Sequence, residues 1–147
     1  MKKVINLVLA VLTVGTLNAQ WTYSKGTTYK SAMTTEDEGA TAVLTAIDGE
    51  ITFWLDGLYY CDENPRVNVY LYKGDTKLLD KEFKASKGSN GDALYINFDL
   101  ASDTTFMKAF TESETLVVLV YESYCSDGSF GYKTGNTKEA VEYILKP

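Results

Sequence analysis

The chain has 147 residues, of which 14 are lysine or arginine, 20 are aspartate or glutamate and none is histidine, which gives a net charge of −6. Without histidine the chain has neither Ser-His-Asp nor Cys-His nucleophilic machinery, and no histidine-ligated metal site. Its acidic balance, spread along the chain without a basic stripe, argues against nucleic acid and against anionic membrane surfaces as partners. The length suits a single domain.

The first 19 residues have the three zones of a secretory signal peptide. Two lysines follow the initiating methionine, residues 4–17 are largely apolar, and Ala19 supplies a small residue at the expected cleavage point. The apolar run is shorter than the roughly 20 residues that a membrane-spanning helix needs. We therefore expect residues 1–19 to be removed and residues 20–147 to be exported, periplasmic or extracellular, without membrane insertion of the mature chain. An uncleaved amino-terminal anchor is the alternative.

Cys61 and Cys125 would meet in the oxidising environment that export implies. Because two cysteines allow one intramolecular pairing, we predict a Cys61–Cys125 disulfide. Closing a loop of about 65 residues would stabilise the fold by roughly 4 kcal/mol in the chain-entropy model. Two buried free thiols are the alternative, and a catalytic redox pair is disfavoured because the chain has no Cys-x-x-Cys.

Short runs rich in Val, Ile, Thr, Tyr and Phe, separated by Asp-Gly, Gly-Asp and Ser-Asn-Gly-Asp turns, indicate antiparallel strands. The clearest hairpin spans residues 42–55, where Asp48-Gly49 is typical of a type I′ turn. A two-residue loop sets Ile47 opposite Glu50 and gives the hairpin one apolar face, which should point into the core. That face comprises Ala42, Leu44, Ala46, Ile51, Phe53 and Leu55.

A second hairpin is predicted to join residues 66–73 to residues 77–83 through a Gly-Asp turn. A two-residue loop would set acidic side chains opposite the apolar face of the first strand. A three-residue loop with a bulge places Leu79 and Phe83 there instead, and we prefer it.

Two further strands are expected over residues 93–99 and residues 115–124. The second contains five consecutive apolar residues, which is typical of a strand covered on both faces. Residues 102–110 can form a short helix with Phe106, Ala109 and Phe110 on one stripe. Stretches 31–39 and 84–92 are expected to be surface loops.

A carboxy-terminal helix is predicted over residues 137–145, with Asn136 as its cap and Glu139 as the return arm of a capping box. We expect this helix to pack on the sheet or to close one end of it. A plain turn at Asn136 is the alternative. The expected apolar face comprises Ala140, Val141, Ile144 and Leu145.

Carboxylates are the remaining candidates for catalysis, since paired acids about 5–9.5 Å apart cleave glycosides. Asp56, Asp62 and Glu63 lie close together in the sequence. Their oxygens can also hold calcium, but no Asp-x-Asp-x-Asp-Gly loop preorganises a site. Turn residues and surface charge are the simpler interpretation. We therefore expect no catalytic residue, no metal and no cofactor, and no glycine-rich phosphate motif occurs.

Eleven tyrosines are many for a chain of this size. An amphipathic aromatic side chain exposed on a sheet face is a ready contact for a sugar ring or a protein partner. Trp54 lies on the less apolar face of the first hairpin, where it either fills a second core layer or marks a binding surface. Cross-strand packing is the alternative for the tyrosines. The candidate binding residues are Trp54, Tyr59, Tyr60, Tyr70 and Tyr72.

Trp21 opens the expected mature chain, hairpins follow, and a strand over residues 130–135 leads through a glycine into the helical stretch 138–141. This pattern resembles the small periplasmic β-sandwich proteins related to invasion-associated locus B and the type VI secretion accessory lipoprotein-like family. The resemblance spans most of the mature chain. It implies a non-enzymatic envelope protein and transfers no binding residue.

The sequence therefore predicts an antiparallel β-sandwich of about seven or eight strands with one or two short helices, in a single domain over residues 20–147. The expected function is that of a non-catalytic envelope or extracellular binding module with a protein partner. A carbohydrate-binding module that uses Trp54 and neighbouring tyrosines is the first alternative. A hydrolase that relies on Asp56, Asp62 or Glu63 is the second.

Overall fold

A computed structural model describes residues 21–27, 29–35, 40–98 and 102–147 of the chain. The predicted signal peptide, residues 1–19, lies outside the described residues. The strands are β1 (Thr22–Lys25), β2 (Lys30–Thr35), β3 (Thr41–Ile47), β4 (Glu50–Asp56), β5 (Arg66–Lys73), β6 (Thr76–Lys87), β7 (Ala93–Ile96), β8 (Thr115–Tyr121) and β9 (Gly128–Lys133), and the helices are α2 (Thr104–Glu112) and α3 (Thr137–Leu145).

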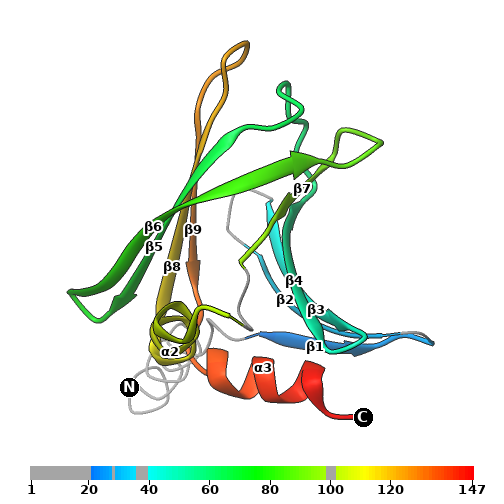
Figure 1. The fold of residues 1–147 in the computed structure, drawn as a ribbon, viewed down its shortest axis with the longest axis vertical. Coiled ribbons are helices and arrows are strands. Elements are labelled where there is room, and N and C mark those ends of the chain that lie inside the picture. The colour runs from blue at the N-terminus through cyan, green and yellow to red at the C-terminus, as the bar shows by residue number, and fades with distance from the viewer. Residues whose placement is uncertain (1–20, 28, 36–39, 99–101) are drawn as a thin grey trace, which may run out of the picture.

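The nine strands form one antiparallel sheet in the order β1-β2-β3-β4-β7-β6-β5-β8-β9. The prediction of a mostly β, antiparallel fold with a carboxy-terminal helix is confirmed. The prediction of two packed sheets is wrong, because β6 joins what would be the two layers. Its first part pairs with β5, while residues 85–87 pair with β7. Figure 1 shows this long strand crossing from one half of the sheet to the other.

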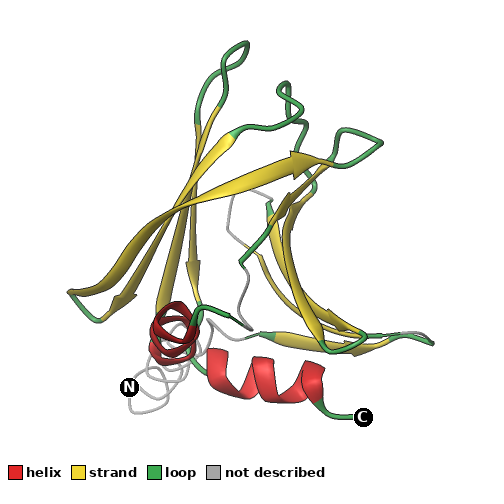
Figure 2. Ribbon diagram, viewed as in Figure 1, coloured by secondary structure: helices red, strands yellow, loops and turns green. Residues whose placement is uncertain are grey.

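The two halves of the bent sheet lie on opposite sides of the molecule, and both helices lie at one end of the space between them (Figures 1 and 2). Helix α3 contacts β2 and β3, and helix α2 contacts β5 and β6. The two helices also contact each other. The carboxy-terminal helix thus closes one end of the sheet, as predicted.

One hydrophobic core fills the space between the halves, and five phenylalanines meet in it. Phe98, which follows β7, is 1% exposed. Its ring centroid lies 4.4 Å from that of Phe53, 5.1 Å from Phe83, 5.0 Å from Phe106 and 5.5 Å from Phe110. These partners come from β4, β6 and α2, so the cluster connects the two halves of the sheet to a helix.

The first hairpin has the predicted register. Ile47 lies opposite Glu50 across the turn, and both turn residues have positive φ, 52° for Asp48 and 83° for Gly49. Such backbone angles are those of a type I′ turn. The predicted inward face is confirmed, with Leu44, Phe53 and Leu55 fully buried.

The second hairpin has a two-residue loop, not the predicted three, and a bulge beside Leu71. The bulge shifts the register, so that Leu79 lies opposite Leu71 and Phe83 opposite Val67. The predicted facing residues are therefore confirmed, although the extra residue lies within the strand and not in the turn.

Strand β8 is not covered on both faces as predicted. Leu116, Val118 and Val120 are buried, whereas Val117 and Leu119 are only half-buried. Both helices lie on the core side of the sheet, at one of its ends. Among the described elements, no helix therefore covers the outer face of β8. Residues 31–35 and 84–87, expected in loops, belong to β2 and β6.

The helix predictions are confirmed in part. Helix α2 buries the expected stripe of Phe106, Ala109 and Phe110. In α3, Asn136 has a left-handed backbone and makes no side-chain cap bond, so it is a turn residue, and Leu145 is exposed. Of the helices in the described segments, none is long and apolar enough to cross a bilayer.

Candidate functional site

The outer face of the β4–β7 pair carries two neighbouring aromatic side chains. Trp54 and Tyr95 are direct cross-strand partners, with ring centroids 5.6 Å apart and planes 43° apart. Trp54 is half-buried and Tyr95 is 41% exposed. Their flanking residues, Phe53 and Leu94 among them, point into the core, so alternation along the strands turns both rings outward.

A groove of about 440 Å³ lies beside Tyr95, where β4 begins, β7 ends and β6 crosses over. Its polar side chains come from three strands and from the loop that precedes β5. Because these segments are far apart in the sequence, the groove exists only in the folded chain. Tyr95 lines it together with Glu50, Thr52, Asn64, Lys84, Ser86 and Asn97.

Gly88 helps to place the Tyr95 ring. A Cβ atom at Gly88 would lie 3.3 Å from Cε2 of Tyr95 and 3.4 Å from Cβ of Ala93, which is tight for a methyl group. The Gly88 N–H donates to the Ala93 carbonyl at 2.8 Å and so closes the turn between β6 and β7. This turn returns the chain so that Tyr95 lies opposite Ser86 on the outer face.

The structure does not bring the five predicted binding residues together. Tyr59 is a loop residue, 74% exposed, whose ring lies against Gly91. Tyr70 and Tyr72 are half-buried on the outer face of β5, in the other half of the sheet. None of the five lines the groove, and Trp54 adjoins it through its ring contact with Tyr95.

Tyr60 is a core residue and not a surface contact. It is 2% exposed, and its pKa is raised because burial disfavours the phenolate, with the charges of Glu122 and Asp56 adding to the effect. The prediction that Tyr60 could meet a ligand therefore does not fit its position.

Tyr95 is the residue that sequence reasoning missed. Alternation of Leu94 and Ile96 toward the core does place Tyr95 on the outer face. Its position beside Trp54 depends on the pairing of β4 with β7, two strands that are not consecutive. No local sequence pattern reports that pairing.

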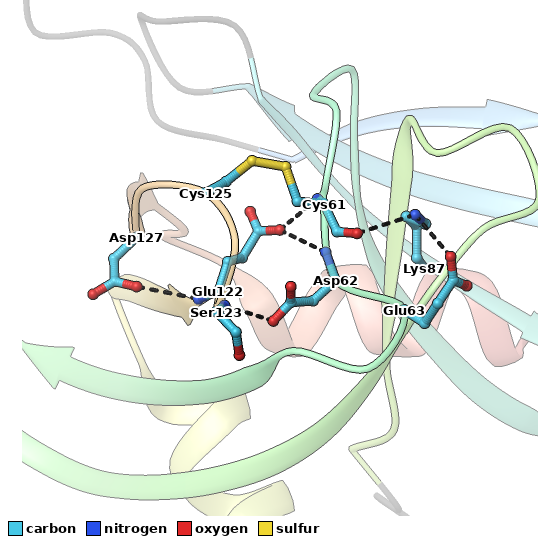
Figure 3. Close-up of a disulfide and its surroundings, with 8 residues drawn as sticks. All are labelled: Cys61, Asp62, Glu63, Lys87, Glu122, Ser123, Cys125 and Asp127. Atoms are coloured by element: carbon cyan, nitrogen blue, oxygen red, sulfur yellow. Dashed lines mark hydrogen bonds and ion pairs between the residues drawn. A yellow bond between two sulfur atoms is a disulfide. The ribbon is translucent and has the colours of Figure 1, made fainter.

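The predicted Cys61–Cys125 disulfide is present (Figure 3). Around it, carboxylates accept hydrogen bonds from backbone N–H groups of the opposite loop. Glu122 accepts from Cys61 and Asp62, and Asp62 accepts from Ser123 at 2.7 Å. The disulfide and these bonds together fasten the loop before β5 to the loop after β8.

The three acids proposed for hydrolysis are placed differently from a catalytic pair. Asp62 holds the Ser123 amide, and Glu63 forms an ion pair of 2.9 Å with Lys87, a contact that raises the pKa of Lys87. Asp56 is exposed at the end of β4. Across the described ranges, no three Cys, Asp or Glu side chains gather in a way that could hold a metal ion.

The fold and the site define an antiparallel sheet with two helices at one end, one disulfide between loops, and a largely polar groove beside Tyr95 on its outer face. Comparisons with models of protein families, with curated proteins and with solved structures found no match.

Proposed function

We propose that residues 20–147 form an exported, non-catalytic binding domain whose ligand binds on the outer face of β4, β6 and β7. The observation that carries the proposal is the Trp54–Tyr95 pair beside a groove of convergent polar side chains. A concave site with an aromatic wall and a few oriented polar groups is the usual form of a ligand site. A larger hollow of about 710 Å³ near the helices has no aromatic side chain in its lining.

Export is supported by the three-zone pattern of residues 1–19 and by the disulfide. Disulfides persist in oxidising compartments and are rare in the cytosol. The resemblance to small periplasmic envelope proteins points in the same direction. Periplasmic and extracellular destinations both fit these observations.

A protein partner on the opposite half of the sheet is a second candidate. There, Tyr70 lies directly across from Val117, and both are half-buried on the outer face. Leu119 and Tyr121 continue this surface along β8. A mixed aromatic and aliphatic surface of this kind suits the centre of a protein interface.

Oxidative footprinting tests the proposal without knowledge of the ligand. Side-chain oxidation would be measured in the native exported fraction and again in the purified protein. A ligand on the groove is expected to lower the oxidation of Trp54 and Tyr95 several-fold in the native fraction. Tyr124, which is 89% exposed, serves as the internal reference. Protection of Tyr70 and Tyr72 alone would favour the second candidate, and equal oxidation at both faces would contradict the proposal.

A further inference from the structure

We infer that the groove beside Trp54 and Tyr95 binds a neutral oligosaccharide, an inference that rests on the proposed binding function and names its ligand class. The first argument is the aromatic surface. Tyr95 lines the groove and is 41% exposed. A rigid ring of this kind offers its face to the C–H side of a sugar at a small cost in conformational entropy.

The second argument is the chemistry of the polar side chains. A sugar hydroxyl is both a donor and an acceptor, so its site needs groups of both kinds. Glu50 accepts, Lys84 donates, and the amides and hydroxyls of the lining do both. Such a set, next to one exposed ring, complements a molecule with an apolar face and a hydroxylated edge.

The third argument is charge. Glu50 and Lys84 are the charged side chains that line the groove, and their charges offset each other. The whole chain carries a net charge of −6, which disfavours phosphates and other polyanions. A neutral ligand therefore fits better than a nucleic acid or an acidic polysaccharide.

The size of the groove argues against a protein partner at this place. Its volume of about 440 Å³ lies within the roughly 300–1,000 Å³ of small-ligand pockets. A stable protein interface instead covers about 800 Å² on each partner, with few charged groups at its centre. Charged and amide side chains converge here from separate elements, as an oriented small ligand requires.

The site is also fixed before a ligand arrives. Strand pairing holds Trp54 against Tyr95, and Gly88 leaves room for the Tyr95 ring, since a Cβ atom there would lie 3.3 Å from Cε2 of the ring. Because these groups do not have to be ordered on binding, less affinity is lost to entropy. Gly88 is thus a positioning residue for the sugar-binding ring.

The test is binding of the exported, purified protein to an array of plant, fungal, bacterial and animal glycans, followed by affinity electrophoresis in gels that contain the neutral polysaccharides found. Tyr95→Ala and Trp54→Ala are expected to weaken binding by about tenfold each, and Ser86→Ala by about threefold. Tyr95→Phe keeps the ring and should stay near the wild type. Tyr124→Ala, in the exposed loop after β8 and outside the groove lining, is the matched control and should leave binding unchanged.

Two results would overturn the inference: no neutral glycan bound on the array, or glycan binding that survives both Tyr95→Ala and Trp54→Ala. Footprinting separates this failure from failure of the proposed function. If no glycan binds on the array but Trp54 and Tyr95 are protected from oxidation in the native fraction, the groove binds another class of ligand, a protein included. An empty array without protection contradicts both.

Discussion

The indole Nε1 of Trp21 donates a hydrogen bond to Oγ1 of Thr137, 3.3 Å away and 116 positions later in the sequence. The Thr137 hydroxyl in turn donates to the Thr134 carbonyl at 2.7 Å. Trp21 and Thr137 are both buried, 3% and 0% exposed. Trp21, just before β1, is thus fixed to the first turn of α3, which ties the β1 edge of the sheet to the last helix.

Trp21→Ala is expected to lower the free energy of unfolding by about 3–5 kcal/mol, because it removes a large buried side chain. Trp21→Phe keeps most of the packing but loses the hydrogen bond. It should therefore lower the free energy of unfolding by less than Trp21→Ala does, about 1–2 kcal/mol. Urea denaturation followed by circular dichroism measures both. Tyr124→Ala, at an exposed loop position, is the control with no expected change. Stability equal to the wild type in Trp21→Ala would show that Trp21 does not pack against α3 as described.

Phe98→Ala is expected to destabilise the protein by about 3–5 kcal/mol, since the ring contacts four other phenylalanines in the core. Phe98→Leu should cost less, because a leucine fills part of the cavity. Both changes should also loosen α2, whose Phe106 and Phe110 lose a partner. Thermal unfolding gives the stability, and amide hydrogen exchange in α2 gives the local effect. Unchanged exchange in α2 would contradict the coupling.

The disulfide prediction concerns two loops that are 64 positions apart in sequence. Cys61→Ser with Cys125→Ser is expected to lower stability by about 4 kcal/mol, because the unfolded chain regains the entropy of a large loop. The denaturation midpoint of the wild type should fall on addition of a reductant, whereas that of the double variant should not respond. A reductant-sensitive double variant would refute this explanation.

Hydrogen bonds to Glu122 also link the two loops that the disulfide joins. Its carboxylate accepts from the backbone N–H groups of Cys61 and Asp62. Glu122→Gln keeps the shape but weakens these charge-assisted bonds. Faster exchange of the Cys61 and Asp62 amides is the expected result, with the amides of β5 unaffected. Equal exchange rates in the variant and the wild type would show that the disulfide alone holds the loops.

Local patterns predicted local structure well. Asp48-Gly49 gave the turn type, and the type fixed the register of β3 and β4 because a two-residue loop leaves no freedom. Apolar spacing predicted the buried face of α2 and most of that of α3, where Leu145 is exposed. The Asn136 cap failed because an asparagine with left-handed backbone angles supplies a turn, and the sequence pattern is the same for both roles.

Local sequence patterns did not predict how segments far apart in the sequence pair with each other. The two-layer prediction failed because nothing in residues 76–87 tells where β6 changes its partner from β5 to β7. Tyr95 was missed as a site residue for the same reason, since its place beside Trp54 depends on that change. Burial separated the tyrosines that pattern alone had grouped, with Tyr60 in the core and Tyr59 at the surface.

Lys81 also departs from a simple inside-outside pattern. It lies opposite the buried Val69, so its side chain starts on the core face of β6. The ammonium lies 5.1 Å from the ring centroid of Phe83 and pairs with Asp103 at the start of α2. The aliphatic stem can cover apolar surface while the charge reaches the edge of the core. Lys81 therefore anchors α2 to the sheet.

The last prediction follows from the pKa of Asp103, which lies below the ordinary value of 3.8. The hydrogen bond from Lys81 is the largest cause, and the N–H of Phe106 at the helix cap adds to it. Because the folded state favours the carboxylate, the stabilisation is fully present above the unfolded pKa near 4. It is lost as the pH falls through the lower pKa of the folded state.

Asp103→Asn should therefore lower the melting temperature at pH 7, and the difference from the wild type should close as the pH falls below about 4. The asparagine amide oxygen can still accept from Phe106, so the variant isolates the charge from the cap. Lys81→Met keeps the packing of the stem and removes the partner, which should flatten the acid dependence in the same way. A melting-temperature difference that stays constant from pH 7 to pH 2 would mean that the Lys81–Asp103 pair does not contribute through its charge.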